Sequence, residues 1–301
     1  MSLPPPVNVA SPDASDACAP LPAGGTRWNI DEPRLAAALA LPARQWTIDI
    51  VQQTGSTNAD LVQDCRQRPW GDDGAVRLAY RQTAGRGRQG RPWQGQAGMT
   101  FSVALPFALP PARLGGLSLA VGLAVADGLA DCHPALARAV GLKWPNDLQI
   151  DGRKLAGILI ESVPAGPQRA WAVIGIGLNL WRDPAMEQAL GRELAGISEK
   201  WPGFDPASDP TAVLAAVLNR LARMRTEFLA EGFAPMAPRW SARDAYRDQP
   251  VRLLHDGAIL AEGLARGVDE HGHLLLETDE GLRPIASGEL SLRPIAAGTA
   301  P

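Results

Sequence analysis

A length of 301 residues gives room for one large domain or two domains of ordinary size. The formal net charge of -3 argues against a general nucleic-acid binder, and the three cysteines, which lie far apart without a C-x-x-C pair, argue against a disulfide framework or a zinc site. No run is long and apolar enough for a membrane helix and the N-terminus has no signal-peptide pattern, so the sequence predicts a cytoplasmic protein with no membrane partner.

The predicted elements begin after a tail. Residues 1–25 are rich in Pro, Ala and Ser and are expected to be disordered. From Trp46 onward, apolar runs predict strand-like segments at 46–53, 76–83, 100–105, 140–150, 153–162 and 169–180. Helical periodicity and capping residues predict helices from near Ala59, at 113–132, at 211–233 and around Trp240. This order of elements is typical of an α/β domain.

The pattern of apolar and polar residues changes after Pro250. Short alternating strands are separated there by Asp-Gly, Asp-Glu-His-Gly and Asp-Glu-Gly turns, which is the pattern of a small all-β barrel. We therefore expect a catalytic domain at residues 26–245 and a C-terminal barrel at residues 246–297.

The segment GRGRQG, residues 85–90, has the G-x-G-x-x-G spacing of a dinucleotide-binding turn. A strand precedes it, but Pro92, Gly95 and Gly98 exclude the helix that such a turn requires. The segment is therefore a long loop between strands. Its three arginines and its glycines suit capture of a phosphate or carboxylate, and a disordered Arg-Gly tract that touches RNA is the alternative from this stretch alone.

Lysine is rare in this chain. Only three of the 29 basic residues are lysines, Lys143, Lys154 and Lys200, so each is a candidate for a compact positive charge that an arginine cannot replace. The patches GSTN, QTAGRGRQGRPW, KWPND and RKLAGIL, with GIGLN as a partner strand, hold the residue types that bind a phosphate-bearing ligand beside Mg²⁺. The sequence contains no P-loop, no protein-kinase motif and no apparent Ser-His-Asp arrangement.

In their order along the chain, STN, GRGRQGRPW, KWPNDL, RKLAGILIE and GIGLN, followed by a β-rich end, resemble biotin protein ligase over about residues 46–295. The resemblance implies a mixed sheet flanked by helices, like that of class II aminoacyl-tRNA synthetases, with a small Src-homology-3-like barrel at the C-terminus. It also implies an enzyme that makes biotinyl-5′-AMP from biotin and ATP with Mg²⁺. The biotin then passes to a lysine of a biotin carboxyl carrier protein, in acetyl-CoA carboxylase or a related carboxylase.

The resemblance further implies roles for single residues. The expected biotin-binding residues are Ser56, Thr57, Asn58, Gln82, Gly85, Arg86, Gly157 and Gly175. The expected ATP-binding residues are Arg88, Arg91, Trp93, Lys143, Asn146 and Asn179, with Trp93 stacked on adenine. Lys154, Arg88 and Arg86 are the expected catalytic residues, and Lys154 would touch the biotin carboxylate and the α-phosphate. Asp147 is the expected Mg²⁺ partner, directly or through water.

Two related functions remain as alternatives. A biotin-dependent transcriptional repressor would need an N-terminal winged helix-turn-helix, but residues 27–45 have room for one helix at most and no recognition helix. We therefore expect a monofunctional enzyme with no DNA partner. A lipoate-type ligase would carry a different arginine-Ser-Gly-Gly-Gly loop and a downstream histidine, which we do not find. Monomer and homodimer are both compatible with the sequence.

Overall fold

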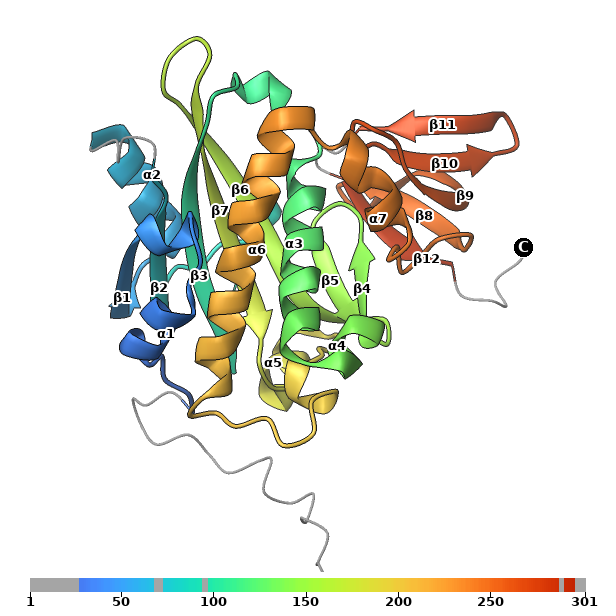
Figure 1. Cartoon of the computed structure of the whole chain (residues 1–301). Helices are drawn as coiled ribbons and strands as arrows, with labels where there is room; N and C mark the ends of the chain where they lie inside the picture. Colours follow the sequence, from blue (N-terminus) through green and yellow to red (C-terminus); the bar gives the residue numbers. More distant parts are fainter. Residues whose placement is uncertain (1–26, 68–72, 94–96, 287–289, 296–301) are drawn as a thin grey trace, which may run out of the picture.

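A seven-stranded mixed sheet organises most of the chain (Figure 1). The computed structural model describes residues 27–67, 73–93, 97–286 and 290–295, so the tail predicted at residues 1–25 lies outside the described residues. The order of the strands is β1-β2-β3-β7-β6-β5-β4. Their bounds are β1 (Thr47–Thr54), β2 (Ala75–Gln82), β3 (Gly98–Phe107), β4 (Val140–Lys143), β5 (Asp147–Ile150), β6 (Arg153–Pro164) and β7 (Ala170–Asn179).

Helices cover both faces of this sheet. The helices are α1 (Glu32–Ala38), α2 (Thr57–Gln67), α3 (Leu117–Cys132), α4 (Pro134–Ala139), α5 (Pro184–Leu190), α6 (Asp209–Glu231) and α7 (Ala237–Ser241). The long helices α3 and α6 lie side by side on one face (Figure 1). On the other face, Leu61 and Cys65 of α2 pack with Ala104 and Val173 of the central strands. Since both faces are covered, all ten residues of β3 are buried.

The structure confirms the predicted mixed sheet flanked by helices. Strands β2 and β3 are joined by a long connection whose one helical feature among the described residues is a 3₁₀ turn at Arg88–Gly90. Helices α4 and α5 were not predicted. Each is at most seven residues long and starts at a proline after a side-chain cap, His133 or Asp183, so neither has enough turns to display helical periodicity.

The C-terminal strands form a second, antiparallel sheet in the order β11-β10-β9-β8-β12. Their bounds are β8 (Pro250–His255), β9 (Ala258–Val268), β10 (Leu274–Thr278), β11 (Gly281–Ile285) and β12 (Leu290–Pro294). Alternate residues such as Val251, Leu253 and Leu292 are buried in a core continuous with that of the large sheet. Trp144, just after β4, donates its indole N–H to the carbonyl of Gly272 at 3.2 Å, so the two sheets are in direct contact.

Candidate active site

One cleft gathers the polar patches of the sequence. It encloses about 990 Å³ of space, with the open solvent at its mouth included. The predicted site residues that line it are Ser56, Thr57, Asn58, Gln82, Arg86, Arg88, Arg91, Trp93, Lys143, Asn146, Asp147, Lys154, Gly157 and Gly175. Two predicted residues are not part of the lining. The carbonyl of Gly85 accepts from the backbone N–H of Trp93 at 2.9 Å, and Asn179 Nδ2 donates to the carbonyl of Lys154 at 3.3 Å.

A polar hydrogen-bond network forms the floor at one end of the cleft. The backbone N–H and the hydroxyl of Thr57 lie 2.8 and 3.1 Å from Gln82 Oε1. Ser102 Oγ lies 2.8 Å from Thr57 Oγ1 and donates to Asn58 Oδ1, also at 2.8 Å. Asn58 Nδ2 in turn donates to Glu161 Oε2 at 2.8 Å. This end of the cleft therefore offers fixed donors and acceptors to a small polar ring.

Helix α2 places the first part of this floor. The helix begins at Thr57 directly after β1, and the Ser56 hydroxyl and carbonyl accept from the N–H groups of Ala59 and Asp60. The prediction of a helix start at the Ser-Thr-Asn cluster is confirmed, two residues earlier than expected. Ser56, Thr57 and Asn58 are all buried, so the cluster contributes more than a helix cap.

Gly175 on β7 makes room for one of these side chains. A Cβ at this position would lie 2.6 Å from Asn58 Oδ1, closer than two such atoms can approach. The sequence predicts that this glycine lets the strand backbone approach a ligand tail. In the structure, part of that space holds the side chain of Asn58, so the glycine also shapes the floor.

The opposite end of the cleft concentrates charge. Lys154 Nζ lies 2.6 Å from Asp147 Oδ1. Burial opposes ionisation of Asp147, but the positive charges of Lys154 and Lys143 outweigh it and lower the pKa of this carboxyl. Burial also lowers the pKa of Lys143 to about 8, against the opposing effect of Asp147. These two lysines and one carboxylate leave a net positive end suited to phosphate oxygens.

The glycine-arginine loop folds over this charged end. The two sides of the loop pair through an isolated β-bridge between Arg86 and Pro92, and the N–H of Gly87 donates to the carbonyl of Arg91 at 2.7 Å. Arg88 Nη1 donates to Asn146 Oδ1 at 3.1 Å, so the loop is tied across the cleft. Gln89 has a φ of 57°, the left-handed conformation that lets the chain turn this sharply.

Trp93 ends the loop and covers the strands. Its ring lies against the backbone of β6 and β7, where a Cβ at Gly177 would collide with the ring and a Cβ at Gly157 would lie 3.1 Å from it. Lys154 Nζ is 5.5 Å from the centroid of the Trp93 ring, within reach of a cation–π interaction. In this structure Trp93 thus packs on the protein, and its stacking on adenine stays a prediction.

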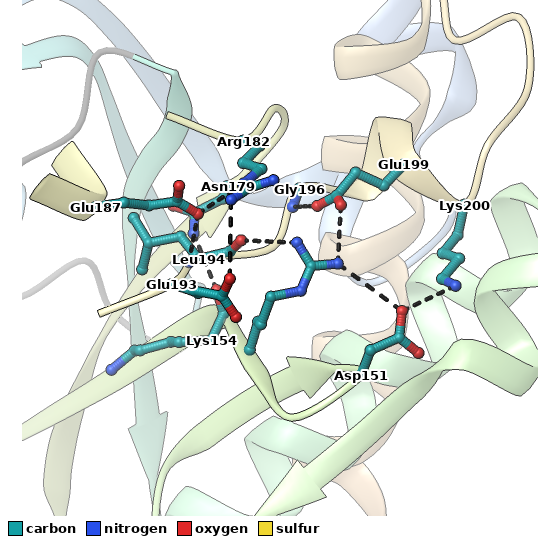
Figure 2. Close-up of polar contacts among 11 residues, drawn as sticks. Asp151, Lys154, Asn179, Arg182, Glu187, Glu193, Leu194, Gly196, Glu199 and Lys200 are labelled. Atoms are coloured by element: carbon teal, nitrogen blue, oxygen red, sulfur yellow. Dashed lines mark hydrogen bonds and ion pairs between the residues drawn. The ribbon is translucent and has the colours of Figure 1, made fainter. Parts of the chain in front are cut away.

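A network of hydrogen bonds and ion pairs holds the backbone of Lys154 in place (Figure 2). The carbonyl of Lys154 accepts from the N–H of Ala195 at 2.9 Å, and Leu194 forms a parallel bridge with Lys154. The neighbouring Arg153 donates to the carbonyl of Leu194 at 3.2 Å and to Glu199 Oε2 at 2.8 Å. Glu187 of α5 accepts the N–H of Leu194 at 2.8 Å. In Figure 2 the amine of Lys154 points away from this network, so the network holds the backbone and leaves the amine free to face the cleft.

Sequence reasoning missed several cleft residues. Ser102 lies in the floor, Arg192 lies in the segment after α5, and Arg293 of β12 comes from the C-terminal sheet. Ser102 is, with Thr100, one of two polar residues in the buried strand β3, and this was the one local signal available. Arg192 and Arg293 carry no local signal, because only the fold brings them to the cleft.

The donor set around Asp147 limits how a metal ion can be held. Among the described residues that line the cleft, Asp147 is the one carboxylate, and no group of three or more His, Cys, Asp or Glu side chains forms a metal cluster in the described part of the chain. A Mg²⁺ ion would thus take most of its oxygen ligands from a nucleotide and from water. Proteins commonly hold nucleotide-bound Mg²⁺ in this way, so the residues fit this role.

Comparisons with known proteins agree with this geometry. A model of the biotin/lipoate A/B protein ligase family matches residues 50–179, and a model of the biotin protein ligase C-terminal domain matches residues 248–293. The chain is 35% identical over 251 residues to the bifunctional ligase/repressor BirA of Escherichia coli (strain K12), covering 82% of this chain and 74% of that protein. It is 33% identical over 266 residues to the biotin--[acetyl-CoA-carboxylase] ligase of Mycobacterium tuberculosis, covering 87% and 95%.

A solved structure also matches. The biotin protein ligase from Aquifex aeolicus in complex with biotin and ATP superposes with a TM-score of 0.65 at 28% sequence identity, covering 83% of this chain and 99% of that one. In the part of the chain that the structure describes, every helix is too short or too polar to cross a membrane.

Proposed function

The chain belongs to the biotin protein ligase family, and on that premise we propose that it attaches biotin to a lysine of a biotin carboxyl carrier protein at the expense of ATP. One observation carries the proposal. A single cleft joins a floor of fixed donors and acceptors to a positively charged end under an arginine loop. The first part suits the polar ring of biotin, and the second suits the phosphates of ATP.

The reaction has two half-reactions. A biotin carboxylate oxygen attacks the α-phosphorus of ATP, and the bond to the β-phosphate oxygen breaks to release pyrophosphate. The amine of the acceptor lysine then attacks the acyl carbon of biotinyl-5′-AMP and expels AMP, losing a proton. Both steps build negative charge on oxygens, so fixed cations supply most of the acceleration.

Lys154 is the residue best placed for the first step. Its amine faces the cleft while its backbone is clamped by the segment at Leu194 and Ala195. We assign to it the biotin carboxylate and the α-phosphate, and Asp147 holds the amine in place at 2.6 Å until those anions arrive. Arg86 and Arg88 act beside it from the loop, and Arg91 and Lys143 bind the outer phosphates.

We assign the remaining roles by the position of each residue along the cleft. The ring of biotin lies on the floor formed by Ser56, Thr57, Asn58 and Gln82, with its tail along Gly157 and Gly175.

Asn146 lies beside the nucleotide at the other end of the Arg88 contact, and Trp93 stacks on adenine once the ligands displace it from the strand backbone. Gly85 and Asn179 act through the loop and through Lys154, since their contacts are with those groups.

We also propose that Mg²⁺ accompanies the nucleotide at Asp147. The ionised carboxylate is the one acidic group lining the described cleft, and the ATP phosphates supply the other ligands. Bound there, the ion would neutralise charge on the pyrophosphate leaving group. Lys154 and Lys143 keep the carboxylate ionised for it.

The acceptor and the compartment complete the proposal. The relative from Mycobacterium tuberculosis is named for acetyl-CoA carboxylase, and we propose a carrier domain of that enzyme as the acceptor here. We place the reaction in the cytoplasm, where ATP is available and thiols stay reduced. Burial raises the pKa of the Cys65 and Cys132 thiols to about 12, which suits cysteines with no redox role.

Release of pyrophosphate from ATP tests the first half-reaction directly. With Mg²⁺ and biotin alone, the protein should release pyrophosphate, and lipoate in place of biotin should give a far lower rate. Addition of a purified carrier domain should then yield a biotinylated lysine by mass spectrometry. Equal rates with biotin and lipoate, or no product with either, would refute the proposed substrate.

A further inference from the structure

A carboxylate stands behind the polar floor of the cleft and is not part of its lining. Glu161 lies on β6 and is half-buried, and its Oε2 accepts from Asn58 Nδ2 at 2.8 Å. Asn58 is 4% exposed and fills the space left by Gly175. An ionised carboxylate can only accept hydrogen bonds, so it requires the NH₂ end of the Asn58 amide to face it.

This orientation propagates along the floor. With its NH₂ group toward Glu161, Asn58 presents Oδ1 to Ser102, whose hydroxyl donates to it at 2.8 Å. A hydroxyl has one proton, so Ser102 has only lone pairs left for Thr57 Oγ1, 2.8 Å away. The Thr57 proton then lies between two acceptors, Ser102 Oγ and Gln82 Oε1. What Thr57 can offer the cleft is therefore a lone pair.

We propose that Glu161 is a positioning residue that makes Thr57 a hydrogen-bond acceptor toward the ligand and so selects a ring carrying N–H donors. The inference rests on the proposed function, because the ureido ring of biotin carries such N–H groups. Without the carboxylate, the Asn58 amide is free to turn over, Ser102 can donate to Thr57, and Thr57 can point its own proton at the ligand N–H. The floor would then keep its shape, but the direction of its hydrogen bonds would no longer be fixed.

The test is steady-state pyrophosphate release by the full chain with Mg²⁺, biotin and ATP. Glu161→Leu should raise KM for biotin by about tenfold, as expected when a ligand N–H loses its buried partner, and leave KM for ATP and the melting temperature close to wild type. Glu161→Gln can still accept through Oε1, so its KM for biotin should stay within about threefold of wild type. Ser162→Ala is the control, since Ser162 follows on the same strand, points to the opposite face and is exposed.

A double variant shows whether Glu161 acts through Asn58. If it does, Glu161→Leu combined with Asn58→Leu should be no worse for biotin than Asn58→Leu alone, whereas independent roles would give additive losses. Additive losses would overturn the inference, and so would a wild-type KM for biotin in Glu161→Leu. A parallel rise of both KM values with a lower melting temperature would mean that Glu161 is only structural.

The glutamine variant keeps the inference testable if the leucine variant fails to fold. A tenfold rise of KM for biotin in stably folded Glu161→Gln would show that the charge of Glu161 matters and its acceptor role does not, which overturns the relay. Wild-type protein that releases no pyrophosphate with biotin would overturn the proposed function itself. Wild-type turnover with no response to Glu161→Leu would overturn only the role of Glu161.

Discussion

Two of the three lysines of the chain line the cleft, and the third does not. Lys154 pairs with Asp147 and Lys143 lies opposite Asp147 on the neighbouring strand, whereas Lys200 pairs with Asp151 at 2.9 Å outside the cleft. A lysine amine is a compact charge that fits beside a carboxylate in a crowded site, where a guanidinium would need more room. The rarity of lysine in the sequence therefore pointed to positions that the fold brings together.

We expect Lys154→Ala to slow adenylate formation by about a hundredfold or more while the protein stays folded. Losing a charged contact made mainly in the transition state costs roughly 2–4 kcal/mol. Pyrophosphate release measures the rate, and circular dichroism checks the fold. Lys154→Arg should recover little activity. Lys200→Ala, which removes a lysine outside the cleft, is the control, and a near wild-type rate for Lys154→Ala would contradict the role.

Lys143 gives a prediction for pH. Burial lowers its pKa to about 8, so in the free enzyme Lys143 is charged below that pH and loses its proton above it. If Lys143 binds phosphate, KM for ATP should rise as the pH passes from 7 to 9.5. Lys143→Arg stays charged over this range, so its KM for ATP should change less with pH whatever its absolute value. Parallel pH profiles of the two proteins would exclude Lys143 as the cause.

At the scale of elements, two segments hold the reacting end of the cleft. The loop from Gly85 to Trp93 closes it from one side and is tied down by the contact of Arg88 with Asn146. The segment after β7, including α5, grips the backbone of Lys154 from the other side. The loop is bonded to Asn146 in the turn between β4 and β5, and the segment after β7 is bonded to Lys154 on β6.

We expect Arg88→Gly to make biotinyl-5′-AMP and to lose it into solution. Without the contact to Asn146, the loop retains the reactive intermediate less well and water or foreign amines reach it. Biotinylation of lysines on an unrelated bystander protein, detected with labelled avidin, measures the leak. Retention of the intermediate as tight as in wild type would exclude this role for Arg88.

On the scale of the whole molecule, the second sheet is part of the site. Residues 290–293 of β12 line the cleft. The chain between the two sheets pairs with β4 through a parallel bridge between Leu142 and Asp244. Asp244 accepts the N–H of Tyr246 through Oδ1, while its Oδ2 is buried with no hydrogen-bond partner among the described residues. Burial raises the pKa of Asp244 to about 6. The junction of the two sheets thus contains a poorly solvated carboxyl.

This carboxyl predicts a stability that depends on pH. A raised pKa means that the folded protein binds the proton more tightly than the unfolded chain, so this group stabilises the fold below about pH 4 and that stabilisation is lost as the pH rises through about 6. Asp244→Asn should remove this pH dependence. The free energy of unfolding of the variant, measured relative to that of wild type, should therefore increase by about 1–3 kcal/mol between pH 4 and pH 8.

Urea unfolding at several pH values measures this difference. Asp256→Asn, at an exposed turn of the same sheet, is the control. If wild type and Asp244→Asn differ by the same amount at pH 4 and pH 8, the carboxyl is not responsible for any change in stability over that range.

The sequence alone determined the elements and the order of the motifs. Apolar periodicity located strand segments of the large sheet and the helices α3 and α6, and it predicted short strands after Pro250, because the hydrophobic pattern of an element lies in its own residues. The loop at residues 85–90 could be separated from a dinucleotide-binding turn on local grounds, since Pro92 and the nearby glycines exclude a following helix. The site residues came from the resemblance that these motifs carry in their order along the chain, and most of them line one cleft.

Only the tertiary structure decided what completes the cleft. Ser102 lies on β3 and Glu161 on β6, and both meet the side chain of Asn58 because β3 and β6 flank β7 in the sheet. Arg192 and Arg293 reach the charged end from segments far along the chain. Hydrogen bonds and charges act over a few ångströms in space regardless of sequence separation, so a residue whose partners are distant in the chain leaves no pattern among its neighbours.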